Sequence, residues 1–239
     1  MSQELSVKVF SDGAVLETML KDLKSGLVTG FTTNPSLMKK AGITSYIGFA
    51  KAALKEIRDY PVSFEVFADD LDTMEKEAEK IASLGENIYV KIPVTNSKGQ
   101  TTLPLIRKLS QKGIKLNVTA IFTLKQTQAV VDALQAGVPA IVSIFAGRIA
   151  DTGVDPLPIM AAALAICRTK EAVELLWASP RETFNIYQAD RLGVDIITCT
   201  SDLIAKLALK DKDLTEYSLE TVQMFLRDST SLGFKILED

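Results

Sequence analysis

The chain has 239 residues, enough for one large domain or two small ones, and its hydrophobic content of 47% can build a sizeable core. Its net charge is −3 and no apolar run reaches the roughly 18 residues of a membrane helix, so we expect no nucleic-acid or membrane partner. The lack of histidine excludes histidine bases, Ser-His-Asp triads and histidine-ligated zinc, which leaves lysine, carboxylates, hydroxyls and amides for any catalysis.

Eight short apolar, β-branched runs alternate with amphipathic stretches of about one helix each. Residues 70–83 and 124–135 are typical of such helices, and a last helix is expected at about 218–231, after the eighth unit. The expected strands are, in chain order, 7–11, 28–32, 62–66, 88–92, 115–119, 140–144, 175–178 and 195–198.

This alternation predicts a single α/β domain over residues 1–239, folded as a (β/α)₈ TIM barrel with an extra C-terminal helix. No Pro- or Ser-rich linker interrupts the series, and an open doubly wound sheet is the alternative. Glycine stands between a helical stretch and the next strand at five places, where it can supply a left-handed residue after the helix: Gly26, Gly85, Gly113, Gly137 and Gly193.

Cysteine usage and the first residues indicate the compartment. Cys167 and Cys199 form no CxxC pair, and residues 1–9 have no apolar core behind a basic start, as a secretory signal would. A reducing cytoplasm fits both features.

Polar residues lie at or just beyond the ends of seven expected strands. In a barrel of this kind the active site is at the C-terminal ends of the strands, so these side chains would share one mouth. They are Asp12, Asn34, Glu65, Lys91, Asn117 with Thr119, Ser143 with Phe145, and Ser179 with Arg181.

Lys91 is the most informative of these residues, because lysine is rare in an apolar strand such as Ile88-Tyr89-Val90-Lys91-Ile92-Pro93. It could extend to the barrel rim, or it could be a desolvated amine that attacks carbonyl groups and forms Schiff bases. Glu65 and Asp12 could act as acid and base beside it. Glu65 could also be only its ion-pair partner, and Asp12-Gly13 could be only a turn.

Two segments predict helix starts. Asn34-Pro35-Ser36 places an N-cap before proline, and Ser179-Pro180-Arg181-Glu182 has the pattern of a capping box. The second helix start would form an anion site with Arg181 in its first turn, and Arg148 after strand six could add a second guanidinium.

Five segments resemble the transaldolase family, including the small subfamily that contains the fructose-6-phosphate aldolases. The similarity runs in order from about Phe10 to Ile204. The segments are Phe31-Thr32-Thr33-Asn34-Pro35-Ser36, Tyr89-Val90-Lys91-Ile92-Pro93, Asn117-Val118-Thr119, Ser143-Ile144-Phe145-Ala146-Gly147-Arg148-Ile149 and Ala178-Ser179-Pro180-Arg181.

The resemblance implies a class I mechanism that needs no metal and no cofactor, with Lys91 forming a Schiff base with a sugar-phosphate ketone. Glu65 would move protons through a water that Thr119 helps to hold, and Asp12 would take the proton next to the breaking bond. Asn34, Asn117 and Ser143 would bind the three-carbon fragment, and Arg148, Ser179 and Arg181 the phosphate. A homo-oligomer, a pentamer or decamer, is also implied.

The same resemblance distinguishes transfer from simple cleavage. In the fructose-6-phosphate aldolases a tyrosine matches Phe145 and a glutamine matches Glu65, so this chain has the transaldolase combination at both positions. Ile144 stands where the family commonly has proline, and Trp177 and Pro180 flank Ser179 unusually. These departures leave open the anion of the natural substrate, phosphate or sulfonate, and its chain length.

Three alternatives stay open at this point. The chain could be an aldolase that releases free dihydroxyacetone, or a phosphate-binding barrel isomerase or epimerase in which Lys91 acts only through its charge. It could also be a catalytically silent barrel kept for assembly or ligand binding.

Overall fold

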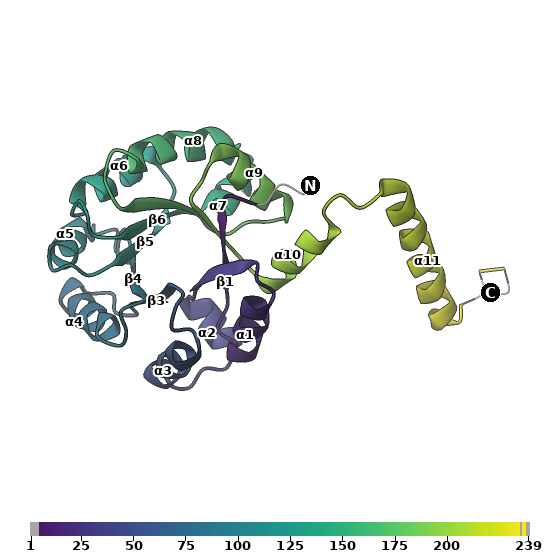
Figure 1. Ribbon diagram of the computed structural model, residues 1–239, viewed down its shortest axis with the longest axis horizontal. Helices are drawn as coiled ribbons and strands as arrows, with labels where there is room; N and C mark the ends of the chain where they lie inside the picture. Colours follow the sequence, from purple (N-terminus) through teal and green to yellow (C-terminus); the bar gives the residue numbers. More distant parts are fainter. Residues whose placement is uncertain (1–4, 235, 238–239) are drawn as a thin grey trace. The chain divides into compact units, whose positions relative to one another are not determined.

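Eight parallel strands form a closed barrel in the order β1 to β8 (Figure 1). The computed structural model describes residues 5–234 and 236–237. The strands are β1 Lys8–Asp12, β2 Val28–Thr32, β3 Val62–Glu65, β4 Ile88–Pro93, β5 Leu116–Ile121, β6 Ala140–Ile144, β7 Val173–Trp177 and β8 Ile196–Cys199. The predicted (β/α)₈ barrel is confirmed, and each strand overlaps its predicted range.

Helices follow every strand and surround the barrel (Figure 1). Those of the barrel units are α1 Leu16–Lys24, α2 Pro35–Lys40, α3 Tyr46–Glu56, α4 Leu71–Ala82, α5 Leu103–Gln111, α6 Leu124–Ala133, α7 Ala146–Ala150, α8 Pro156–Cys167, α9 Phe184–Leu192 and α10 Ser201–Ala205. The short helices α2 and α7 are additions to the simple strand–helix alternation, and both begin directly at the barrel mouth.

The turns before the strands differ in one place from the glycine pattern. Gly26, Gly113, Gly137 and Gly193 have the positive φ expected after a helix, whereas Gly85 does not. A side chain at Gly85 would meet Asn87 Oδ1 at 3.1 Å, so close packing explains this glycine better than backbone conformation does.

The barrel interior has an apolar floor, because alternate residues of each strand point inward. Phe10, Ile141, Leu176 and Ile196 pack together there, and Tyr89 lies against them. Gly30 of β2 makes room for this packing, since a Cβ atom at that position would be 2.5 Å from the ring of Phe10. The next inward residues along several of these strands are polar and form the layer above the floor.

The chain divides into two units, Met1–Ile204 and Ala205–Asp239. The second unit consists of the 3₁₀ helix η1 Lys206–Leu209 and helix α11 Leu214–Leu232, which covers the predicted 218–231 and begins earlier. Asp213 caps α11 by accepting bonds from the backbone N–H groups of Thr215 and Glu216. No helix within the described residues is long and apolar enough to cross a membrane.

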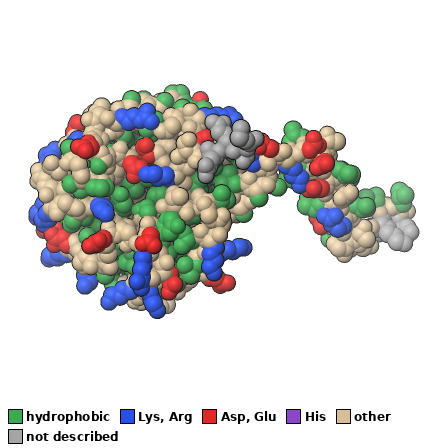
Figure 2. Space-filling model, viewed as in Figure 1, with side chains coloured by type: hydrophobic (Ala, Val, Ile, Leu, Met, Phe, Trp, Pro, Cys, Tyr) green, Lys and Arg blue, Asp and Glu red, His purple; other side chains and the backbone are tan. Residues whose placement is uncertain are grey.

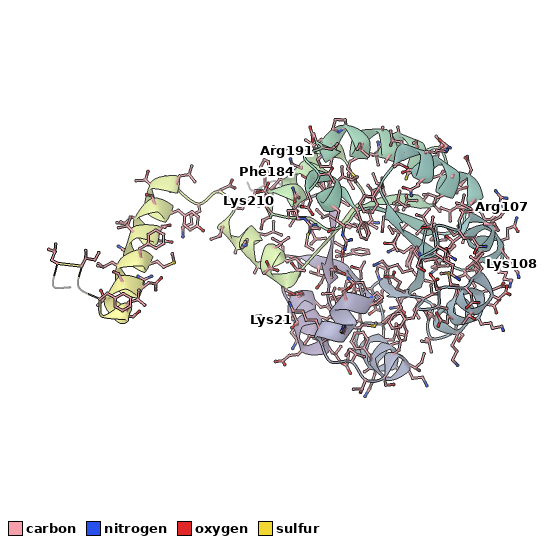
Figure 3. The ribbon with its side chains drawn as sticks, turned by 180° about the vertical axis from the view of Figure 1, so that it is seen from behind. Lys21, Arg107, Lys108, Phe184, Arg191 and Lys210 are labelled. Atoms are coloured by element: carbon pink, nitrogen blue, oxygen red, sulfur yellow. The ribbon has the colours of Figure 1, made fainter. Side chains whose placement is uncertain are left out.

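On the face of the barrel unit seen in Figure 2, acidic and basic side chains are interspersed. Ion pairs join neighbouring helices of the barrel unit. Lys108 of α5, labelled with Arg107 in Figure 3, lies 2.7 Å from Glu75 of α4. Lys112, the residue that follows α5, contacts both Glu75 and Glu79. Exposed pairs of this kind contribute little to stability, so the barrel depends mainly on its apolar interior.

Candidate active site

A cavity of about 430 Å³ lies at the C-terminal ends of the strands, where the expected polar residues meet. Every predicted site residue except Arg181 lines it: Asp12, Asn34, Glu65, Lys91, Asn117, Thr119, Ser143, Phe145, Arg148 and Ser179. The tertiary structure therefore brings together side chains that come from seven different strand–loop segments.

Strand register places three of these residues side by side. Glu65 of β3 is the partner of Lys91 on β4, and Lys91 is the partner of Asn117 on β5. Because partner residues in a parallel sheet point to the same side, a carboxylate, an amine and an amide form one row inside the barrel mouth.

Lys91 is 7% exposed, so its amine does not extend to solvent at the rim. Its Nζ atom donates to the backbone oxygen of Thr33 at 3.1 Å and lies 3.3 Å from Glu65 Oε2. The amine thus has a proton acceptor at contact distance while it still lines the cavity.

The charge of Lys91 acts on two carboxyl groups, those of Asp12 and Glu65. Burial raises the pKa of Asp12, and both Lys91 and a hydrogen bond from Thr32 oppose that rise. Burial likewise raises the pKa of Glu65, against the effect of Lys91, and the charge of Asp12 raises it further. Both groups therefore bind protons more readily than exposed carboxylates do, as acid–base work near neutral pH requires.

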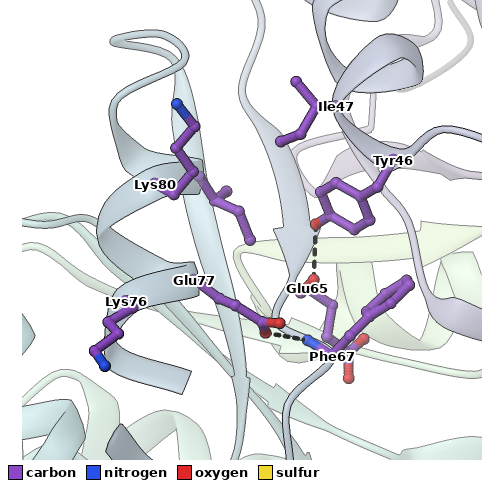
Figure 4. A pocket seen from close by; sticks show the side chains of 8 residues that line it. Tyr46, Ile47, Glu65, Phe67, Lys76, Glu77 and Lys80 are labelled. Atoms are coloured by element: carbon purple, nitrogen blue, oxygen red, sulfur yellow. Dashed lines mark hydrogen bonds between the residues drawn. The ribbon is translucent and has the colours of Figure 1, made fainter. Parts of the chain in front are cut away.

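The loop after β3 is anchored so that Glu65 has a fixed position (Figure 4). The hydroxyl of Tyr46 donates to the backbone oxygen of Glu65 at 2.7 Å, and burial raises the pKa of Tyr46, which keeps it a phenol. Glu77 accepts from the backbone N–H groups of Phe67 and Ala68. Tyr46, Glu65, Phe67 and Glu77 also line a second cavity of about 360 Å³, and of these residues Glu65 alone lines the first cavity too.

Asn117 and Ser143 are held by a buried chain of hydrogen bonds. Ser143 Oγ donates to Asn117 Oδ1 at 2.6 Å, and Asn117 Nδ2 donates to Ser63 Oγ at 2.9 Å. The Asn117 amide is therefore fixed in orientation, and the residue lines the cavity. Asn34 caps α2 through its Oδ1 atom, as predicted, and its Nδ2 group can donate to a ligand.

Thr119 lies within an irregular part of β5. The register with β6 shifts between Val118 and Ile121, and Ala120 has a φ of 59°, which strains a residue other than glycine. The Oγ1 atom of Thr119 is buried and has no hydrogen-bond partner within the described residues. A buried hydroxyl that lines a cavity and has no protein partner is suited to hold a water molecule.

The expected helix start at Ser179 is wrong. Ser179 has a φ of 61°, incompatible with the extended backbone of an N-cap, and α9 begins only at Phe184. Arg181 therefore precedes the helix. Its guanidinium binds Asp151 through two hydrogen bonds and does not line the cavity.

Arg148 and Ser179 do line the cavity, and helix α7, which carries Arg148, is in direct contact with the backbone of Ser179. A Cβ atom at Gly147 would overlap the backbone oxygen of Ser179 at 1.5 Å, so only glycine permits this approach. Phe145, at the start of α7, has the Arg148 guanidinium 5.3 Å from its ring centre and packs on Phe122.

Thr32 and Thr198 also line the cavity, and the sequence analysis assigned neither of them a role. Thr198 lies on β8, the one strand for which the sequence indicated no polar residue at the barrel mouth. A threonine inside a strand is too ordinary for its type to reveal a site, so only the position of β8 beside β1 identifies it. Among the described residues, no group of three or more acidic or cysteine side chains is arranged to hold a metal ion.

Comparisons with known proteins place this chain in a family. The family described as "Transaldolase/Fructose-6-phosphate aldolase" matches residues 9–236. A "Probable transaldolase" of Methanococcus maripaludis strain C7 is 37% identical over 205 residues, covering 84% of this chain and 89% of that protein. Another from Thermoanaerobacter sp. strain X514 is 34% identical over 231 residues, covering 96% and 100%.

Solved structures with low sequence identity share the architecture. A 3-keto-L-gulonate-6-phosphate decarboxylase from Vibrio cholerae superposes with a TM-score of 0.53 at 13% identity, covering 83% of this chain and 89% of that one. KGPDC from Streptococcus mutans gives 0.56 at 10% identity, covering 82% and 88%. These similarities concern the fold alone.

The buried charge of Asp12 leads to a prediction about stability. Its pKa is raised in the folded state, so ionised Asp12 opposes folding above that pKa, and the effect vanishes below the unfolded value. Asp12→Asn should therefore raise Tm at pH 7 by roughly 2–4 °C, the shift that about 1 kcal/mol produces in a domain of this size.

Thermal unfolding from pH 7 to pH 3.5 measures this effect, and the gain should shrink as the pH falls. Glu75→Gln is the control of opposite sign, because Lys108 and Lys112 lower the pKa of Glu75. A destabilised Asp12→Asn variant at pH 7 would contradict the prediction.

Proposed function

The chain belongs to the transaldolase/fructose-6-phosphate aldolase family, and from this membership we propose that it is a transaldolase that transfers a dihydroxyacetone unit through a Schiff base on Lys91. The donor would be fructose 6-phosphate or sedoheptulose 7-phosphate and the acceptor an aldose phosphate. The observation that carries the proposal is the buried amine of Lys91, 3.3 Å from Glu65 in a cavity lined by hydroxyl and amide groups.

The first step is attack of neutral Lys91 on the ketone of the donor. Glu65 is close enough to accept the ammonium proton, and its raised pKa makes it a better acceptor. Loss of water from the carbinolamine then needs a proton for the departing hydroxide. We assign its delivery to Glu65 through a water held by Thr119, whose buried hydroxyl is available for that bond.

The second step breaks the carbon–carbon bond. Asp12 takes the proton of the hydroxyl beyond that bond, and this hydroxyl becomes the carbonyl of the leaving aldose. The electron pair of the broken bond forms an enamine and neutralises the iminium nitrogen on Lys91. Asn34, Asn117 and Ser143 would hold the hydroxyl groups of the three-carbon fragment, since all three line the cavity beside Lys91.

The phosphate would bind at the far end of the cavity, beside Arg148 and Ser179. Arg181 can join them only by exchanging the Asp151 carboxylate for the phosphate. Arg148 is therefore the principal anion-binding residue in this proposal and Arg181 an auxiliary one.

The amine can be tested by trapping. Fructose 6-phosphate with borohydride should leave a permanent adduct on the peptide that contains Lys91, and Lys91→Met should abolish both the adduct and transfer. Peptide mass mapping measures the first and a coupled assay the second. Lys108→Met, at an exposed position, is the matched control.

An adduct on another lysine, or full activity of Lys91→Met, would exclude this mechanism. Complete lack of trapping together with isomerase or epimerase activity would favour an electrostatic role for Lys91. A folded barrel with neither adduct nor activity would indicate a silent one.

The anion-binding residues make a separate prediction. Arg148→Ala should raise KM for phosphorylated substrates roughly tenfold or more, the usual effect of losing a charge-assisted hydrogen bond. Arg181→Ala should raise it less, because this guanidinium must first leave Asp151. Non-phosphorylated glyceraldehyde as acceptor is the control, and equal losses for both acceptors would mean that the arginines stabilise the fold instead.

Phe145 decides between transfer and release of free dihydroxyacetone. Protonation of the enamine needs a donor, and a phenyl ring cannot polarise a water as a phenol can. We predict slow release of dihydroxyacetone, faster transfer to erythrose 4-phosphate, and a higher release-to-transfer ratio for Phe145→Tyr. Phe122→Tyr, which changes the adjacent ring, is the control. If the wild type releases dihydroxyacetone as fast as it transfers it, the protein is an aldolase and not a transaldolase.

We also propose that the protein is a homo-oligomer, a pentamer or decamer, assembled through α11. Leu219, Val222 and Phe225 are spaced three apart in α11, so they form an apolar stripe along the helix that a neighbouring subunit can cover. Light scattering should give a multiple of the 26.0 kDa chain mass, lowered by Phe225→Glu and unchanged by Arg227→Glu. A wild-type monomer would exclude this assembly.

A cytoplasmic location completes the proposal. Cys167 and Cys199 are both buried and unpaired, as in proteins of reducing compartments, and sugar phosphates are intracellular substrates. Fractionation of producing cells tests it, and recovery in a secreted fraction would contradict it.

A further inference from the structure

Strand β1 lies between β2, which carries Thr32, and β8, whose Thr198 is the register partner of Phe10. Thr32 is the register partner of Asp12, and its hydroxyl donates to Asp12 Oδ1 at 2.7 Å. The hydroxyls of Thr32 and Thr198 are 2.5 Å apart. Both threonines are almost completely buried, at 2% and 6% exposure, so this chain of two hydroxyls is shielded from bulk water.

The chain has a direction while Asp12 is ionised. A carboxylate can only accept hydrogen bonds, and each hydroxyl has one proton to donate. Thr32 uses its proton on Asp12, so the proton between the two hydroxyls must come from Thr198. Thr198 thereby fills the acceptor side of Thr32 and prevents its hydroxyl from turning away from Asp12.

We propose that Thr198 and Thr32 are positioning residues that hold Asp12 Oδ1 in a hydrogen bond and direct the proton of the substrate hydroxyl to Oδ2. The inference rests on the proposed function, because it requires Asp12 to be the base in carbon–carbon cleavage. In that step the substrate O–H bond breaks and an O–H bond forms on Asp12 Oδ2. Thr32 continues to donate to Oδ1, so neither threonine gives up its proton.

The hydroxyl chain also adjusts the acidity of Asp12 among its charged neighbours. The bond from Thr32 favours the ionised carboxylate, as does Lys91 of β4. Burial opposes ionisation, and so does the charge of Glu65 on β3, with which Asp12 interacts. Cys199, next to Thr198 on β8, has a raised pKa and stays a neutral thiol at the pH of the reaction. Asp12 is thus the group whose titration the threonines should affect.

The test compares variants that remove a hydroxyl but keep the shape with variants that keep the hydroxyl. Thr32→Val should lower kcat for transfer roughly tenfold and move the acid limb of the kcat/KM profile upward by roughly one pH unit, as expected for losing a hydrogen bond to a charged group. Thr198→Val should shift both in the same direction by less. Thr32→Ser and Thr198→Ser should recover most of each loss.

Borohydride trapping on Lys91 in the same variants separates this inference from the proposed function. Trapping should persist in all four, because Schiff-base formation precedes the step that uses Asp12. A wild-type pH profile for Thr198→Val, or equal losses in its Val and Ser variants, would overturn the role of Thr198 while the proposed function stands. Full transfer by Asp12→Asn would overturn the inference as well, since Asp12 would then not be the base. Failure of wild-type trapping would overturn the proposed function itself.

Discussion

The buried amine of Lys91 is the constraint around which the barrel mouth is arranged. An ammonium group removed from water is costly unless opposite charge and hydrogen bonds compensate it. Glu65 and the backbone oxygen of Thr33 supply that compensation at 3.3 and 3.1 Å. Burial raises the pKa of Asp12, and the charge of Lys91 opposes that rise. The pKa values of both carboxyl groups in the mouth therefore depend on the charge of Lys91.

The apolar floor beneath them makes this coupling strong. Phe10, Ile141, Leu176 and Ile196 pack together in the barrel interior, on the other side of the charges from the cavity mouth. Low polarity on one side strengthens every interaction above it. Packing and chemistry are linked at this boundary, since a change in the floor would alter the electrostatics of the site as well as the stability of the barrel.

The two ends of the cavity are built differently. Lys91, Asn117 and Ser143 lie on strands and are fixed by register and buried hydrogen bonds. The proposed anion end consists of Arg148 in the short helix α7 and Ser179, whose backbone is strained, with Arg181, paired with Asp151, as an auxiliary residue. Rigid strands suit the bond-making groups, whereas loops can change the anion and the length of the substrate without disturbing them. Of the departures from the family pattern, Pro180 follows Ser179 directly, whereas Ile144 and Trp177 are buried at the ends of β6 and β7.

Sequence by itself determined the eight strand–helix units, the closed barrel, and ten of the residues that line its mouth, because hydrophobic periodicity and strand ends are local features. It misplaced the helix after Ser179, since nothing in a capping pattern reveals a left-handed backbone. It assigned no role to Thr198, a residue of common type that matters only because the last strand closes beside the first. Likewise, the Asp151–Arg181 pair and the contact of Gly147 with Ser179 join different loops. Only the tertiary structure decides such features, because they depend on distances between segments that are remote in the chain.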